Sequence, residues 1–218
     1  MEISLNAVEA RIIGVLIEKE ISTPEYYPMT LNALVNACNQ RTNRDPVMEL
    51  DEAAVSDALD RLRTDRLVWQ VKTQGSRALK YEHNMKDVAD LSNSALALLC
   101  ELLLRGPQTA GELRTRTARM TEFTGVPAVE YALKKLAEHE KGPFVKQLPR
   151  QPGRKESRYV HLLGDTEIIA PELSSDMETD SRSRAPTRIE ALEARVASLE
   201  TQLEEVRKAF LDFKQAFE

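Results

Sequence analysis

The chain has 218 residues, of which 42% are hydrophobic and 30% are charged, and its formal net charge is −5. No apolar run approaches the roughly twenty residues that cross a bilayer, and the N-terminus lacks the basic and then apolar pattern of a signal peptide. We therefore expect a cytoplasmic protein with no membrane partner, long enough for two small domains and an appendage.

The first ninety residues predict three helices followed by a β-hairpin. Apolar spacing places these elements at about residues 5–20, 31–39, 51–64 and 67–84. Thr30 and Asp51 are suitable N-caps for the second and third helices, because their side-chain oxygens can accept hydrogen bonds from free backbone amides. The return strand of the hairpin carries Tyr81 and His83, which would share one face and pack at the base of the hairpin.

The same order of elements recurs about ninety residues later. Two helices are expected at about 94–105 and 110–119, and a third begins near Pro127 and ends before Gly142, which suits its C-cap. A strand at 144–148 then leads through a glycine-containing tip to a second return strand. This strand repeats the Tyr-x-His pattern at Tyr159 and His161.

Three helices and a β-hairpin are the plan of a winged helix. The repetition therefore predicts an α+β protein, mainly α with small β-hairpins, in which two tandem winged-helix domains precede a C-terminal coiled-coil helix. The expected boundaries are winged helices at 1–84 and 94–164, linkers at 85–93 and 165–187, and the coiled coil at 188–218.

The tail repeats apolar residues at alternating spacings of three and four, which predicts a coiled-coil seam. The seam consists of Ile189, Leu192, Val196, Leu199, Leu203, Val206, Phe210, Phe213 and Phe217. With Ile189 at position a, arginines fall at g and glutamates at the following e positions, and opposite charges there favour a parallel homodimer. The alternative is an amphipathic helix that folds back on the protein's own domains.

Charge is distributed unevenly along the chain. Residues 1–90 carry 11 Lys and Arg side chains against 15 Asp and Glu, whereas residues 105–163 carry 12 against 6. The second half is therefore the better candidate to contact a polyanion such as double-stranded DNA. The candidate DNA-binding residues come from its second helix, third helix and wing: Arg114, Arg116, Arg119, Tyr131, Lys134, Lys135, Lys146, Arg150, Arg154, Lys155 and Arg158.

The first half fits DNA less well. Asp51 and Glu52 stand at the start of its third helix, where carboxylates would repel phosphates. Its polar loop holds Asn39, Gln40, Arg41, Asn43 and Arg44. This loop is either a contact surface or a segment whose amides satisfy neighbouring backbone groups, and we favour the second because Asn and Asp commonly do this.

Patterns typical of catalysis or metal binding are weak. Cys38 and Cys100 lie in apolar helical stripes, so we expect them to be buried rather than to form a disulfide or a metal pair. The histidines His83, His139 and His161 belong to separate elements, and no glycine-rich phosphate loop or nucleophile elbow occurs. We therefore expect a non-enzymatic protein that uses no cofactor and no metal.

Two functional interpretations follow. The first is a dimeric, DNA-binding regulator that works through its basic second half. The second is a scaffold whose winged helices and coiled coil bind protein partners. The basic second wing favours the first interpretation, and the overall acidity favours the second.

Several segments resemble the uncharacterised YceH family of bacterial proteins. The resemblance is carried by Glu25-Tyr26-Tyr27-Pro28-Met29-Thr30-Leu31-Asn32-Ala33-Leu34, by Ala37-Cys38-Asn39-Gln40-Arg41 and by Asn43-Arg44-Asp45-Pro46-Val47-Met48. It covers about residues 1–165 and includes the opening Leu5-Asn6-Ala7-Val8-Glu9-Ala10-Arg11. It implies tandem winged-helix domains in a bacterial cytoplasm, and it supplies no reaction and no ligand.

Overall fold

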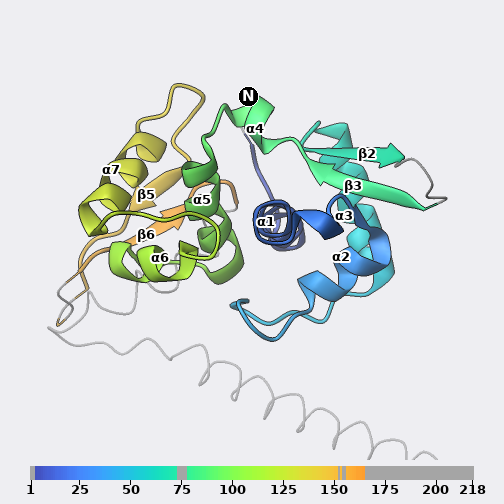
Figure 1. Ribbon diagram of the computed structural model, residues 1–218, viewed down its shortest axis with the longest axis horizontal. Coiled ribbons are helices and arrows are strands. Elements are labelled where there is room, and N and C mark those ends of the chain that lie inside the picture. The colour runs from blue at the N-terminus through green and yellow to red at the C-terminus, as the bar shows by residue number, and fades with distance from the viewer. Residues whose placement is uncertain (1–2, 73–77, 152, 154–155, 165–218) are drawn as a thin grey trace, which may run out of the picture. The chain divides into compact units, whose positions relative to one another are not determined.

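The computed structural model describes residues 3–72, 78–151, 153 and 156–164, so the predicted linker at 165–187 and the coiled coil at 188–218 lie outside the described residues. The described part is an α+β structure with two small antiparallel sheets, each of three strands (Figure 1). It falls into two halves with the same order of elements. No described helix is both long and apolar enough to cross a membrane.

The described residues of the first half form four helical segments and three strands. They are α1 (Ala7–Ser22), the 3-10 turn η1 (Pro24–Tyr26), β1 (Met29–Thr30), α2 (Leu31–Cys38), α3 (Glu52–Thr64), β2 (Val68–Lys72) and β3 (Leu79–His83). The predicted caps are confirmed: Thr30 Oγ1 accepts from the amide of Ala33, and Asp51 Oδ1 accepts from that of Ala54. The strand order is β1-β3-β2.

The second half repeats this arrangement. After the short helix α4 (Met85–Ala89) come α5 (Asn93–Arg105), β4 (Gln108–Thr109), α6 (Ala110–Thr117), α7 (Val126–Ala137), β5 (Val145–Gln147) and β6 (Arg158–His161). The strand order β4-β6-β5 matches that of the first half. The backbone junctions match too: Leu67 N donates to Leu62 O before one hairpin, and Phe144 N donates to Leu136 O before the other.

Three features differ from the sequence prediction. The segment 85–93 contains α4, and each sheet gains a two-residue strand, β1 or β4, which is too short to show an alternating pattern. Gly142 is not the C-cap of α7. That helix ends at Ala137 with Glu138 as its cap, and Gly142 has a positive φ of 127° in the following turn.

The two halves share one continuous hydrophobic core through α1 and α5, which lie beside each other at the centre of Figure 1. The backbones approach closely where Cys100 Sγ donates to Gly14 O at 3.2 Å. A Cβ atom at Gly14 would lie 2.8 Å from Leu104 Cδ2, so glycine is needed there. Both cysteines are buried and free, as predicted.

The N-terminal segment also joins the halves. Leu5 N donates to Leu163 O at 2.7 Å, and Leu5 forms a parallel bridge with Gly164, just after β6. These backbone contacts connect the end of the second half to the start of the first.

Candidate nucleic-acid interface

Helix α7 exposes Glu130, Tyr131, Lys134 and Lys135 to solvent. Its buried stripe consists of Val129, Leu133 and Leu136. The side chains on the opposite side of the helix therefore face solvent. Tyr131 is 62% exposed, and Lys135 Nζ lies 4.9 Å from the centroid of its ring. Lys134 Nζ is 3.9 Å from Glu138, one turn further on, and both side chains are largely exposed. An exposed pair of this kind contributes little energy, so both lysines are available to a ligand.

The arginines of α6 divide into two kinds. Arg114 is exposed. Arg116 Nη1 donates to Gln108 Oε1 at 2.6 Å, and Arg116 Nη2 lies 3.7 Å from Glu112 Oε1. The side chain of Arg116 therefore bridges β4 and the first turn of α6 rather than standing free.

The hairpin β5–β6 adds cations beside α7, which it contacts directly (Figure 1). Lys146 and Arg150 are exposed, and neither has an ion-pair partner among the described residues. Arg158 is half-buried, and its Nη1 donates to Pro107 O at 3.5 Å. Arg154 and Lys155 lie outside the described residues.

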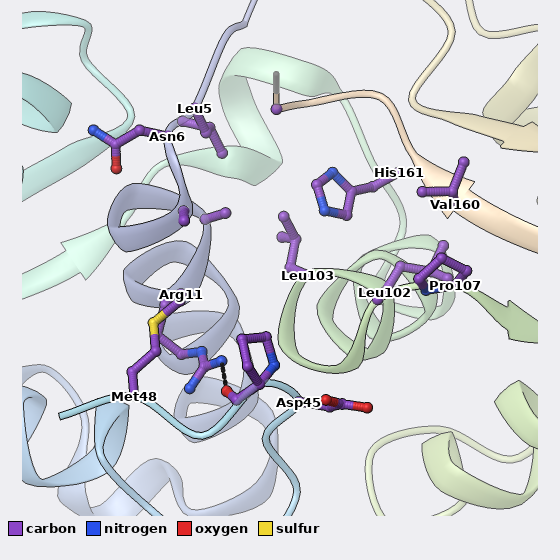
Figure 2. Close-up of a pocket in the computed structure, with 15 residues that line it drawn as sticks. Leu5, Asn6, Arg11, Asp45, Met48, Leu102, Leu103, Pro107, Val160 and His161 are labelled. Carbon is purple, nitrogen blue, oxygen red and sulfur yellow. Dashed lines mark hydrogen bonds between the residues drawn. The ribbon is translucent and has the colours of Figure 1, made fainter. Parts of the chain in front are cut away.

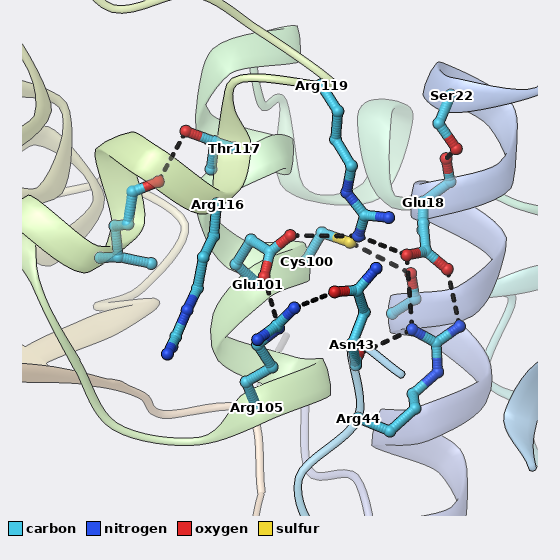
Figure 3. Close-up of polar contacts among 12 residues, drawn as sticks. Glu18, Ser22, Asn43, Arg44, Cys100, Glu101, Arg105, Arg116, Thr117 and Arg119 are labelled. Atoms are coloured by element: carbon cyan, nitrogen blue, oxygen red, sulfur yellow. Dashed lines mark hydrogen bonds and ion pairs between the residues drawn. The ribbon is translucent and has the colours of Figure 1, made fainter. Parts of the chain in front are cut away.

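Arg119, which the sequence placed with the DNA-binding residues, belongs to a network between the halves (Figure 3). Its Nη2 donates to Glu18 Oε1 on α1 and to Glu101 Oε1 on α5, the latter at 3.2 Å. Glu18 Oε2 also accepts a hydrogen bond from Arg44 Nη2 at 2.6 Å. Arg105 Nε lies 3.2 Å from Glu101 Oε2. Two buried carboxylates and three arginines thus bind α1, α5 and the polar loop together.

The two carboxylates of this network respond differently to their surroundings. Burial acts to raise the pKa of Glu18, but the hydrogen bond and charge of Arg44, with the charge of Arg119, outweigh it and hold the pKa below its usual value. At Glu101 burial prevails over Arg119 and Arg105 and raises the pKa. Glu18 is therefore the better-compensated charge of the two.

The polar loop 39–46 is ordered by internal contacts. The side chain of Asn39 donates to Leu50 O at 2.7 Å and accepts from Leu50 N at 2.8 Å, while Arg44, only 5% exposed, donates to Ala37 O. Asp45 N donates to Leu104 O on α5 at 2.9 Å. These contacts support the interpretation of the loop as a segment that satisfies neighbouring backbone groups.

The equivalent helix of the first half, α3, offers a different surface. Arg61 Nε is 2.7 Å from Glu9 on α1, and Arg63 Nη1 is 2.9 Å from Asp60. Exposed acids remain along the helix at Glu52 and Asp57. Arg61 of α3 is therefore tied to a buried carboxylate, whereas Arg63, like Lys134 of α7, belongs to an exposed ion pair.

Six of the predicted residues of the second half are exposed, and others are bonded within the protein. The exposed members are Arg114, Tyr131, Lys134, Lys135, Lys146 and Arg150. Arg116, Arg119 and Arg158 have partners inside the protein. We call the exposed set the basic face of the second half.

Comparisons with known proteins identify relatives along the whole chain. The sequence model of a family described as "Protein of unknown function, DUF480" matches residues 5–154. A UPF0502 protein of Pelobacter propionicus is 48% identical over 221 residues, which cover 100% of both chains. A UPF0502 protein of Geobacter sulfurreducens is 50% identical over 203 residues, which cover 93% of this chain and 90% of the relative.

A UPF0502 protein of Shewanella sp. strain MR-7 is 49% identical over 214 residues, with 95% of each chain covered. The identities and the coverage confirm the resemblance seen in the sequence. The chain belongs to the uncharacterised bacterial family DUF480, also called UPF0502 or YceH.

Proposed function

We propose that each half is a winged helix. The support is the order helix, short strand, helix, helix and hairpin in both halves, together with a sheet order in which the last strand lies between the other two. In this arrangement α3 and α7 are the equivalent recognition helices, and the β2–β3 and β5–β6 hairpins are the wings.

The proposed function is regulatory binding of double-stranded DNA through the second half, with no catalytic step. The observation that carries it is the contrast between the two recognition helices. Tyr131, Lys134 and Lys135 of α7 face solvent beside the hairpin, whose Lys146 and Arg150 have no ion-pair partner among the described residues. On α3, Arg61 pairs with the buried Glu9 of α1.

The chemistry of the basic face suits this task. Lys146 and Arg150 on the wing would neutralise phosphates, which gives affinity without sequence preference. Lys134 and Tyr131 on α7 would reach base edges in the major groove, where sequence is read. The proposal places the protein in the cytoplasm as a homodimer, because pairing two weak binding surfaces raises affinity through effective concentration.

A salt titration tests the proposal. Fluorescence anisotropy of a labelled random-sequence duplex would compare the full chain with a Lys146→Gln/Arg150→Gln variant. The variant should bind more weakly at low salt. The slope of log affinity against log salt should become shallower by roughly 0.9 for each phosphate that the variant no longer neutralises.

The matched control removes two cations from the first half with Arg63→Gln/Lys72→Gln, since both side chains are exposed. This variant should bind the duplex as the unaltered protein does. Equal losses of affinity in both variants, or no binding by the unaltered chain at tens of micromolar protein in low salt, would contradict the proposal.

A second candidate is a protein-binding scaffold. Trp69 on β2 is 43% exposed, Leu79 on β3 is 42% exposed, and the acids of α3 lie in the same half. Aromatic side chains are enriched at protein interfaces, which have a polar rim. An unaltered chain that fails to bind any duplex would favour this candidate.

A further inference from the structure

A pocket of about 240 Å³ lies between the two halves (Figure 2). It is lined by the start of α1, the loop segment 45–48, the end of α5, and β6 with the residues beside it. Most of the lining is apolar and includes Leu5, Ala10, Met48 and Leu103. The exposed residues Asn6 and Asp45 mark its open side.

The repeat provides an internal comparison for the histidine in this pocket. His83 and His161 occupy the same register position, opposite Val68 in one sheet and Val145 in the other. His83 is fully partnered, because its Nε2 lies 3.0 Å from Glu20 and its Nδ1 accepts from Met85 N.

His161 has no such partners. Its Nδ1 is buried and makes no hydrogen bond to any described residue, while the ring lines the pocket. Burial lowers the pKa of His161 to about 4, so the ring is neutral at pH 7 and can both donate and accept a hydrogen bond. A buried polar atom without a partner is costly, and a ligand group that bonds to it would remove that cost.

Arg11 is the buried charge of the pocket lining. It is 2% exposed, and its two terminal nitrogens donate to the backbone oxygens of Cys38 and Pro46, at 3.0 and 2.6 Å. Its Nε has no hydrogen-bond partner among the described residues. Burial and the nearby charge of Arg44 lower the pKa of Arg11, while the carboxylates of Asp45 and Glu18 oppose this shift.

The two polar groups are separated along the pocket. Figure 2 shows Arg11 on one side and His161 on another, with the apolar Leu103 between them. A ligand that uses both therefore needs an anionic end, an apolar body and a polar group at the far end. A cavity of about 150 Å³ holds benzene, so this one has room for a single ring with two small substituents.

We propose that the pocket binds a small hydroxy-substituted carboxylic acid with an apolar body. The carboxylate lies against Arg11, the body packs on the apolar lining, and the hydroxyl group forms a hydrogen bond with the imidazole of His161. Since residues of both halves line the pocket, the ligand fastens one half to the other. The site is independent of DNA binding, and its test contains no DNA.

The test is a calorimetric titration of the full chain with three probes that differ in one group each: 4-hydroxyphenylacetate, phenylacetate and 4-hydroxyphenylacetamide. The first should bind with a dissociation constant between roughly micromolar and millimolar, as expected for a ligand of this size. Removal of the hydroxyl or of the charge should weaken binding by about threefold to tenfold or more, the equivalent of one hydrogen bond or ion pair.

His161→Phe tests the histidine without harming the fold, because it removes an unpartnered polar atom and keeps an aromatic ring. This variant should bind 4-hydroxyphenylacetate as weakly as the unaltered protein binds phenylacetate, and it should bind phenylacetate without loss. A loss that is equal for both probes would overturn the role of His161.

Ala10→Met tests the pocket itself, since the longer side chain would fill it, and Ala53→Met on the exposed side of α3 is the matched control. The first variant should lose binding and the second should keep it. Binding that survives in Ala10→Met, or no heat from 4-hydroxyphenylacetate at millimolar concentration, would overturn the proposal.

Discussion

Glu18 on α1 joins the two halves through Arg119, and Glu101 on α5 of the second half shares this arginine. Both are buried, at 1% and 0% exposure, and both contact Arg119 from the second half. Glu18 has the additional bidentate partner Arg44, whose guanidinium is itself satisfied by the backbone at Ala37. A buried charge with this many partners is costly to disturb, because its removal leaves the opposite charges uncompensated.

Glu18→Gln should therefore lower the free energy of unfolding at pH 7 by roughly 3–5 kcal/mol, whereas Glu101→Gln should cost less. Since the folded pKa of Glu18 lies below the usual 4.5, its contribution is complete above that value and is lost as pH falls through the folded pKa. Glu101 has a raised pKa, so its ionisation costs stability as pH rises past its usual value.

Urea unfolding at pH 7 and about pH 4 measures both effects. The cost of Glu18→Gln should shrink at the lower pH. A larger loss for Glu101→Gln than for Glu18→Gln would contradict the assignment of the two charges.

At the scale of elements, the contact of α1 with α5 depends on one glycine. Gly14→Ala would place a methyl group 2.8 Å from Leu104, in a fully buried helix contact, and should destabilise the protein by about 1–3 kcal/mol. Gly111→Ala on α6 is the matched control, because the nearest atom to its Cβ would be 3.8 Å away. The control should stabilise by about 0.5–1 kcal/mol.

Thermal unfolding of both variants measures this difference. If Gly14→Ala were as stable as Gly111→Ala, the close approach of the two helices in solution would be in doubt.

The helices were predictable because their signals are local. Apolar stripes and the caps Thr30 and Asp51 depend on neighbours within one turn, and the hairpins follow from short apolar runs around glycine. The strands β1 and β4 were not predicted, because a strand of two residues is too short to show an alternating apolar pattern. These strands form only by pairing with β3 and β6.

The candidate sites were predictable only in part. The exposed lysines of α7 follow from the helical period, but the pairing of Arg119 with Glu18 joins residues 101 positions apart and leaves no periodic trace. One signal was present. Glu101 interrupts an otherwise apolar helix, and Glu18 stands beside a buried stripe of α1, and charges in such places need partners.

At the scale of the whole molecule, the heptad repeat of the tail predicts self-association. Deletion of residues 187–218 should convert a dimer into a monomer in sedimentation experiments, because it removes the complete seam, and should leave the unfolding of residues 3–164 unchanged. A full-length chain that is already monomeric at tens of micromolar would contradict the dimer, since that concentration detects micromolar association.

The most direct test of the central claim, that the second half and not the first contacts DNA, is amide hydrogen exchange of the full chain with and without a duplex at low salt. We predict slower exchange in α7 and the β5–β6 hairpin and no change in α3. The exposed lysines of α7 lie beside Lys146 and Arg150, which have no ion-pair partner among the described residues, whereas Arg61 of α3 pairs with the buried Glu9. Protection of α3 with exchange in α7 unchanged, or no protection anywhere at saturating duplex, would contradict it.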